Sequence, residues 1–239
     1  MPIYFQKDIT EDTKLGIWRI EEEEAFFRLK VLPQRNVSHP HKNLQHLAGR
    51  YLLKHLFPEF PVSLILVADT RKPYLQDEAY HFSISHCSDY AAAIVSKTQR
   101  VGVDIEVPSV KVERIRHKFL GVDEPAAVEW IQGNGQWATV QGLDAVLETP
   151  AAATVSSSAL LTLLWSCKEA VFKWYGVGEV DFRQHICVQR VRQISETVWE
   201  TEVLFRKGRP VPLTLHSYFF PDAVISFVVT EGAGSGLMG

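Results

Sequence analysis

The stretch Leu160–Gly176, LLTLLWSCKEAVFKWYG, has the composition of a strong helix, because leucine, alanine, lysine and glutamate dominate it. Gly176 stands where helices commonly end in a left-handed residue. Apolar residues recur at spacings of four, three, four and three and form one seam for packing on a core: Leu160, Leu164, Cys167, Val171 and Trp174. We therefore predict an amphipathic helix around which the rest of the chain is organised.

A second stripe of the same helix contains Trp165, Glu169 and Lys173, at successive steps of four. A carboxylate and an ammonium therefore lie one turn apart at the edge of the buried face. Taken alone, this is a surface ion pair that supports the helix by about 0.2–0.5 kcal/mol. A functional role becomes the better interpretation only in the light of the other motifs in the chain.

Length and composition are those of an ordinary globular protein with one large or two small domains, since 46% of the 239 residues are apolar and 22% are charged. A net charge of -3 gives no general attraction to nucleic acid or to an anionic membrane, so neither is an expected partner. No apolar run approaches the ~20 residues of a membrane span, and residues 1–4 open neither a signal nor a transit peptide. Three cysteines without metal-ligand spacing predict reduced thiols in a cytoplasmic protein: Cys87, Cys167 and Cys187.

Local patterns elsewhere predict both helices and strands, which favours an α+β fold. Helices are expected at Ile17–Leu32, His41–Phe57, Val112–Leu120 and Glu124–Ile131. Strands are expected at Ser63–Ala68, His81–Ser85, Tyr90–Ser96, Val101–Glu106, Ile186–Val191, Val198–Phe205, Leu213–Phe219 and Ala223–Val229. Gly133–Ser158 lacks sustained periodicity apart from Leu143–Leu147 and predicts a long loop.

A weak internal similarity hints at two lobes. His81–Val95 and His216–Val228 each combine a strand, a turn containing aspartate and a second strand. We therefore expect two similar α+β lobes that meet near Thr98–Arg100. The lobes would comprise residues 1–100 and 101–231, followed by a disordered tail at residues 232–239.

Two acids project from the same side of the predicted strand Val101–Glu106, VGVDIE. Side chains alternate along a strand, so Asp104 and Glu106 share a face with Gly102, about 7 Å apart at Cα. The simplest interpretation is a solvated strand face. However, magnesium is usually held by one or two carboxylates together with substrate phosphates. With Glu169 there are three acids, which would repel one another unless a cation lay among them.

The segment His81–His86, HFSISH, places Ser85 and His86 where a strand gives way to a turn. Alone, His86 is best interpreted as a loop histidine with a local hydrogen bond. Beside Arg71, Lys72 and Lys173 it becomes a candidate phosphate contact, because cationic and hydroxyl donors together suit phosphate oxygens.

Four motifs, taken in order, resemble the 4'-phosphopantetheinyl transferases of the large single-chain type, the Sfp-type family. They are RKPYL at 71–75, HFSISH at 81–86, VGVDIE at 101–106 and WSCKEAVFK at 165–173. The G-x-D-x-E and W-x-x-K-E-x-x-x-K pair is specific, whereas the N-terminal helices and C-terminal strands agree only in kind. The resemblance therefore covers Arg71 to Gly176.

This resemblance implies an activity and a fold. Such enzymes transfer 4'-phosphopantetheine from coenzyme A to a serine of an apo acyl or peptidyl carrier protein and release adenosine 3',5'-bisphosphate. The implied fold is two similar α+β lobes in a pseudo-twofold arrangement, with the active site at their junction. Because one chain would supply both lobes, we expect a monomer.

The resemblance also implies roles for individual residues. Asp104 and Glu106 match the magnesium ligands, and Glu169 matches a third acid described both as ligand and as candidate base. Lys173 matches the lysine near the pyrophosphate, so the catalytic set would be Glu169, Lys173 and Asp104. The remaining coenzyme A contacts would be Lys72, Ser85 and His86.

One position departs from the family pattern. The second helix usually offers an arginine to the nucleotide phosphate, and the nearest alignment places Gln45 there. The substitute stays open among Arg50, Lys42 and His46.

Two other functions remain open from the sequence. A magnesium-dependent pyrophosphate hydrolase would release bisphosphate without a carrier. A catalytically silent coenzyme A or carrier-binding protein is disfavoured, because Asp104, Glu106 and Glu169 are all present. Which carrier is served does not follow from the residues.

Overall fold

The structure is a computed structural model that describes residues 3–31, 39–121, 124, 129–131, 137–139 and 157–231. The chain forms two compact units. The first comprises Met1–Ile105, Lys173–Val177 and Val229–Gly239, and the second comprises Glu106–Phe172 and Gly178–Val228.

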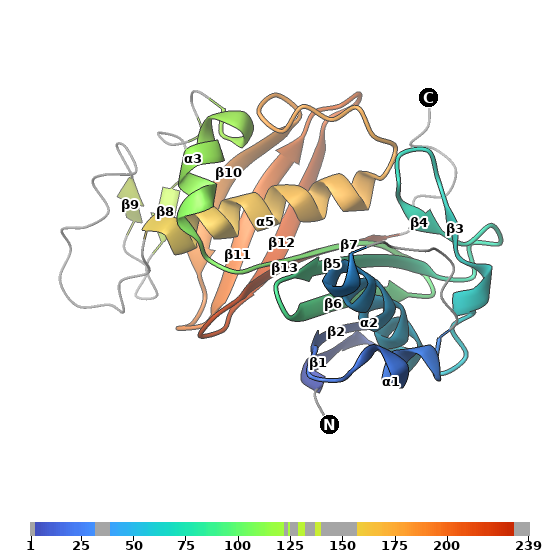
Figure 1. The fold of residues 1–239 in the computed structure, drawn as a ribbon. Helices are drawn as coiled ribbons and strands as arrows, with labels where there is room; N and C mark the ends of the chain where they lie inside the picture. The colour runs from blue at the N-terminus through green and yellow to red at the C-terminus, as the bar shows by residue number, and fades with distance from the viewer. Residues whose placement is uncertain are drawn as a thin grey trace. The chain divides into compact units, whose positions relative to one another are not determined.

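The first unit is built on an antiparallel sheet covered by one long helix (Figure 1). Its strand order is β1-β2-β6-β5, and α2 packs on β2, β5 and β6. The bounds of these elements are β1 Ile3–Thr10, β2 Thr13–Arg19, β5 His81–Cys87, β6 Tyr90–Ser96 and α2 Pro40–Leu56. Smaller elements are α1 Glu24–Arg28, a 3₁₀ turn at Val62–Leu64 and the paired strands β3 Leu66–Val67 and β4 Pro73–Tyr74. Strand β7, Gln99–Glu106, belongs to this unit up to Ile105.

A glycine lets α2 approach the strand that bears Ser85. A Cβ added at Gly49 would lie 2.7 Å from Cγ2 of Ile84 on β5. Around this contact the core is filled by side chains that are almost inaccessible to solvent, including Leu47, Leu52 and Phe82. The close approach therefore fixes α2 against β5.

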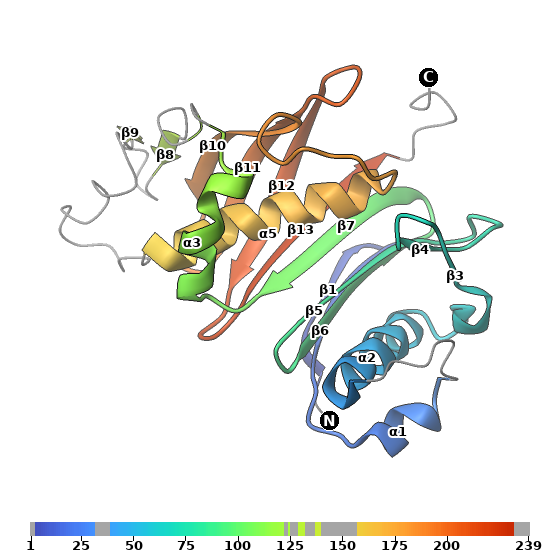
Figure 2. The same cartoon turned by 45° about the horizontal axis from the view of Figure 1, so that its top comes forward.

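The second unit is a mostly antiparallel sheet with two helices on one face (Figure 2). Its strand order is β13-β12-β11-β10-β8-β9, and only β8 runs parallel to its neighbour β10. The strands are β8 Glu129–Ile131, β9 Trp137–Thr139, β10 Ile186–Gln193, β11 Val198–Phe205, β12 Val211–Phe219 and β13 Val224–Glu231. The helices are α3 Val110–Phe119 and α5 Ser157–Tyr175, whose last residues, from Lys173 onward, count with the first unit.

The predicted seam of α5 is confirmed. All five of its apolar residues are at most 3% exposed. Cys167 lies 3.5 Å from the hydroxyl of Ser226 on β13, which places this seam on the sheet. The core of the second unit therefore lies between α5 and its strands.

The predicted α+β class is confirmed, since each unit combines a sheet with a long helix. The two similar strand–turn–strand segments are both antiparallel hairpins, β5–β6 and β12–β13. The pseudo-twofold arrangement and the lobe boundary at residues 100 and 101 stay predictions.

Helices α2 and α3 confirm the predictions for His41–Phe57 and Val112–Leu120, but the prediction of a helix at Ile17–Leu32 is wrong. Strand β2 runs to Arg19, and only Glu24–Arg28 is helical. The reason is that β2 lies between β1 and β6, so Leu15 to Trp18 is buried without alternation. A continuous apolar run does not distinguish a central strand from a helix.

Two further predictions are partly wrong. The helix predicted at Glu124–Ile131 is contradicted by β8, because Glu129–Ile131 pairs with β10. The strand predicted at Ser63–Ala68 begins as a 3₁₀ turn and shrinks to Leu66–Val67. The remaining predicted strands are confirmed as β5, β6, β7 and β10 to β13.

The predicted long loop Gly133–Ser158 contains β9 and the first residues of α5; its other residues, among them Leu143–Leu147, lie outside the described residues, as does the tail at 232–239. Among the helices of the described residues, none is both long and apolar enough to cross a membrane.

Candidate active site

Three elements of the first unit bring Asp104, Ser85 and Lys173 together. The Ser85 hydroxyl donates to Oδ1 of Asp104 over 2.7 Å. Nζ of Lys173 lies 2.6 Å from the same oxygen and 2.8 Å from Oγ of Ser85. Asp104 is only 2% exposed, and burying a carboxylate is costly unless it is paired and hydrogen-bonded. The ammonium of Lys173 therefore stabilises this buried charge.

Strands β5 and β7 hold this cluster through their own contacts. The backbone N–H of Val103 donates to the Ser83 hydroxyl over 3.2 Å, which ties the strand bearing Asp104 to the strand bearing Ser85. Lys173 comes from the last turns of α5. Ser83 and Ser85 are two residues apart on β5, so their side chains project from the same face of the strand. This face therefore contacts β7 at two positions, Val103 and Asp104.

His86 follows Ser85 on β5 and has a lowered pKa. Removal from water is the main cause, and the positive charge of Lys173 is the next. The imidazole is therefore mostly neutral near pH 7, where it can donate a hydrogen bond from one ring nitrogen. Lys42 also lowers the pKa of His86, which places this α2 lysine near the candidate phosphate contacts.

The α2 residues that could contact a nucleotide phosphate in place of an arginine differ in their burial and in their hydrogen bonds. Arg50 is 4% exposed and donates to Nδ1 of His46 over 3.0 Å, so it is buried inside the unit. Gln45 donates to the carbonyl of Ser88 over 2.7 Å and thereby supports the β5–β6 turn. Lys42, which is exposed, is the residue of this group that remains suited to a nucleotide phosphate.

Lys72 lies at the C-terminus of α5. Its Nζ donates to the carbonyl of Trp174 at 3.5 Å, and the guanidinium of Arg100 donates to the carbonyls of Trp174 and Tyr175. Cations are favourable at this end of a helix, where carbonyls have no intrahelical partner. Burial, followed by repulsion from Arg100, lowers the pKa of Lys72 to about 8. Gly176, at φ +72°, ends the helix as predicted.

In the second unit, the motif tryptophan Trp165 orients Glu106. The indole Nε1–H donates to Oε1 of Glu106 over 3.0 Å. The third acid, Glu169, is half-buried on the same stripe of α5 as Trp165. Among the described residues, no group of three histidine, cysteine, aspartate or glutamate side chains converges closely enough to hold a metal ion.

Asp104 and Glu106 nevertheless fit a hard cation by their chemistry. Both offer carboxylate oxygens, the ligands that hard cations prefer. Gly102, Asp104 and Glu106 occupy every second position of β7. Each carboxylate oxygen can accept more than one bond, so the contact from Trp165 does not exhaust Glu106.

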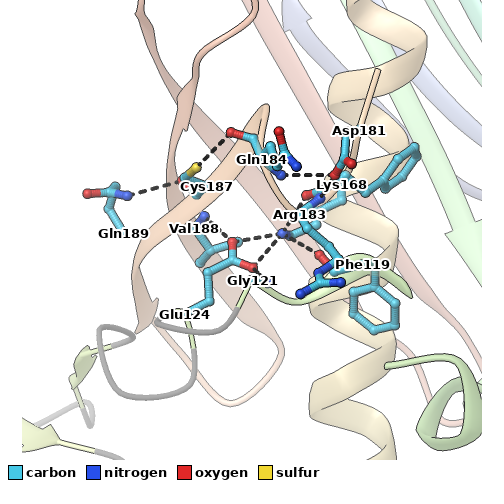
Figure 3. Close-up of polar contacts among 11 residues, drawn as sticks. Phe119, Gly121, Glu124, Lys168, Asp181, Arg183, Gln184, Cys187, Val188 and Gln189 are labelled. Carbon is cyan, nitrogen blue, oxygen red and sulfur yellow. Dashed lines mark hydrogen bonds and ion pairs between the residues drawn. The ribbon is translucent and has the colours of Figure 1, made fainter. Parts of the chain in front are cut away.

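A buried ion pair was not predicted from the sequence. Lys168 is fully buried, and its Nζ lies 2.7 Å from both carboxylate oxygens of Glu124 (Figure 3). Glu124 also accepts from the backbone N–H groups of Gly121 and Val188. Burial lowers the pKa of Lys168, and Glu124 opposes this shift. The available signal was spacing, since Lys168 follows the buried Leu161 and Leu164 by seven and four residues.

Comparison with known proteins identifies one family. Residues 100–216 match the family described as the 4'-phosphopantetheinyl transferase superfamily. Enterobactin synthase component D of Escherichia coli (strain K12) is 26% identical over 170 residues, which cover 66% of this chain and 72% of that protein. The component D proteins of Salmonella typhi and Salmonella typhimurium are 42% and 39% identical over 66 residues, and this match spans 27% of their length and 27% of this chain.

We expect Lys168→Met to lower the free energy of unfolding by about 3–5 kcal/mol, because it leaves the Glu124 carboxylate buried without its counter-ion. Urea unfolding measures the change. The matched control is Lys207→Met, which also removes a lysine that donates to two backbone carbonyls, those of Gly178 and Glu179. A loss for Lys168→Met no larger than that of the control would contradict this account of the pair.

Proposed function

Because residues 100–216 match the 4'-phosphopantetheinyl transferase superfamily, we propose that the protein transfers 4'-phosphopantetheine from coenzyme A to a serine hydroxyl of an apo carrier protein. The cluster of Asp104, Ser85 and Lys173 is the observation that supports this most strongly. It combines an ammonium, a hydroxyl and a buried carboxylate, and two of the three residues lie within the matched segment. The matched relatives are named as components of a synthase, which favours an acyl or peptidyl carrier as acceptor.

In this proposal, several side chains bind different parts of coenzyme A. Lys173 uses two of its three N–H donors on Asp104 and Ser85, and its third would bind a pyrophosphate oxygen. His86 would donate a further hydrogen bond to the phosphates, and Lys42 and Lys72 would contact coenzyme A elsewhere. Ammonium groups suit this task because phosphoryl transfer depends mainly on positioning and on neutralising charge.

Asp104, Glu106 and Glu169 are the residues that would hold magnesium. When bound, magnesium would neutralise pyrophosphate charge and favour departure of adenosine 3',5'-bisphosphate. Two observations support ligand roles: Asp104 is a buried carboxylate, and Oε1 of Glu106 is held by the Trp165 indole. We further propose that the protein acts as a monomer in the cytoplasm.

The attacking serine must lose a proton, and Glu169 is the candidate group. Glu169 lies four residues before Lys173 on α5, and a carboxylate near a cation suits a metal ligand better than a strong base. We therefore assign Glu169 chiefly as a ligand, which accepts the serine proton only through a water.

We expect wild-type protein, incubated with coenzyme A, magnesium and a panel of apo carriers, to add the phosphopantetheine mass to a carrier serine. Asp104→Ala should reduce this transfer by about 100-fold or more, because it removes a proposed ligand and the partner of Lys173. Asp8→Ala, at an exposed aspartate of β1, is the matched control. Mass spectrometry of the carrier gives the result, and circular dichroism checks the fold.

The same assay separates the other functions. Bisphosphate release that needs no carrier would instead identify a pyrophosphate hydrolase. Coenzyme A binding with neither release nor transfer would identify a binding protein. Near-normal transfer by Asp104→Ala at saturating magnesium would contradict the assignment of Asp104.

We expect the affinity for adenosine 3',5'-bisphosphate to fall as the pH rises through about 8, the pKa of Lys72. Above this pKa the free protein loses the ammonium charge that attracts a phosphate, so binding must take up a proton and weakens. Calorimetry between pH 7 and pH 9.5 measures the effect, which Lys72→Met should abolish. Lys54→Met, at an exposed lysine of α2, should keep it; a wild-type affinity independent of pH would argue against the Lys72 contact.

We expect Glu169→Gln to need far more magnesium than wild type and to recover much of its turnover when saturated, because the amide keeps one oxygen ligand but loses the charge. A magnesium titration of single-turnover transfer measures both quantities. Turnover that stays low at every magnesium concentration, with nearly unchanged metal affinity, would show that Glu169 is mainly the base.

A further inference from the structure

Two aromatic rings of the second unit flank the Trp165 indole, which orients Glu106. The ring of Phe182 stacks on the Trp165 indole, with centroids 5.6 Å apart and planes at 22°. The ring of Phe119 meets the same indole edge-on at 5.1 Å. The indole thus has aromatic contacts on two sides while its N–H donates to Glu106. Its orientation depends on where Phe119 and Phe182 are held.

The same two phenylalanines are bound through their backbones by Lys168. Nζ of Lys168 donates to the carbonyl of Phe119 over 2.7 Å and to the carbonyl of Phe182 over 2.9 Å. Phe119 is the last residue of α3, and Phe182 lies in the turn between α5 and β10. One ammonium therefore joins two separate chain segments whose rings both contact Trp165.

We propose that Lys168 is a positioning residue for Glu106, acting through Phe119, Phe182 and the Trp165 indole. Lys168 fixes the two phenylalanine backbones, their rings fix the indole, and the indole N–H fixes the Glu106 carboxylate. Glu124 holds the ammonium in place from the other side (Figure 3). This relay rests on the proposed function only in that Glu106 is there assigned as a metal ligand.

Helix geometry explains why α5 can supply two members of this relay, Lys168 and Trp165. Trp165 and Lys168 are three residues apart, so their side chains leave neighbouring positions of α5. Groups that orient a metal ligand without touching the metal typically change its affinity by about 10–100-fold when they are removed. The buried ion pair of Lys168 thus acts on the site from outside it.

The first test needs no metal. The indole N–H resonance of Trp165, one of six tryptophans, is assigned by its loss in Trp165→Phe, and its solvent exchange is followed by NMR in metal-free protein. We expect Lys168→Met to accelerate this exchange by about 10-fold or more, because the rings that flank the indole lose their backbone support. If Lys168→Met does not fold, Glu124→Gln, which keeps the side-chain shape, gives the same test. Unchanged exchange in a folded variant overturns the relay.

The second test measures Mn²⁺ affinity by calorimetry or electron paramagnetic resonance. Trp165→Phe and Lys168→Met should each weaken Mn²⁺ binding by about 10-fold. Combined, they should weaken it little more than either alone, because both act on one path to Glu106. Lys207→Met should leave both readouts unchanged. Effects that multiply in the double variant overturn the relay.

These outcomes are distinguishable from failure of the proposed function. If Asp104→Ala leaves Mn²⁺ affinity unchanged, the metal assignment fails, whereas the exchange of the Trp165 indole still reports on the relay by itself.

Discussion

The buried ammonium of Lys168 is the constraint on which the second unit depends. A charge removed from water must be matched by partners in good geometry, and Lys168 has two carboxylate oxygens and two carbonyls within 2.9 Å. These acceptors come from Glu124, the end of α3 and the turn before β10. If α5 were rotated, the buried ammonium would lose some of these acceptors, which is energetically costly, so they restrict the rotation of the helix.

Two lysines of α5, five residues apart, differ in how completely the protein encloses them. Lys168 has no exposed surface and all its acceptors belong to the protein. Lys173 keeps 26% of its side chain exposed and faces a carboxylate that is only 3% exposed. An ammonium that is partly accessible can exchange a contact for a phosphate oxygen, whereas a fully enclosed one cannot do so without opening the core. The nine residues of the motif thus contain a fully enclosed lysine and a partly accessible one.

The sequence predicts the parts of this arrangement that follow from periodicity. The seam of α5 could be predicted because its burial follows the helical period. Strands β5 and β7 were predicted from the alternation of residue types in the sequence, although the burial of neither strand alternates in the structure. Strand β2 was missed because its apolar end is followed directly by Glu21–Glu24 and by Phe26 and Phe27, a pattern that favours a helix. The role of Lys168 was hidden for a different reason. A lysine in an apolar stripe looks like a solvated residue until its partner is known, and Glu124 lies 44 positions earlier.

For the same reason, it is easier to predict from the sequence which residues lie together than to predict which donors bind them. The sequence indicates that Asp104 and Glu106 share a face, but it does not show that their oxygens are already engaged by different donors, Lys173 and Ser85 for one and the Trp165 indole for the other. Asp104 contacts an ammonium and a hydroxyl, whereas Oε1 of Glu106 accepts from a neutral indole N–H. Charge and direction are the two properties that a cation ligand needs. Residues outside the acid motif hold each of the two carboxylates, so the placement of these oxygens depends on Ser85 and on the α5 motif as well as on β7.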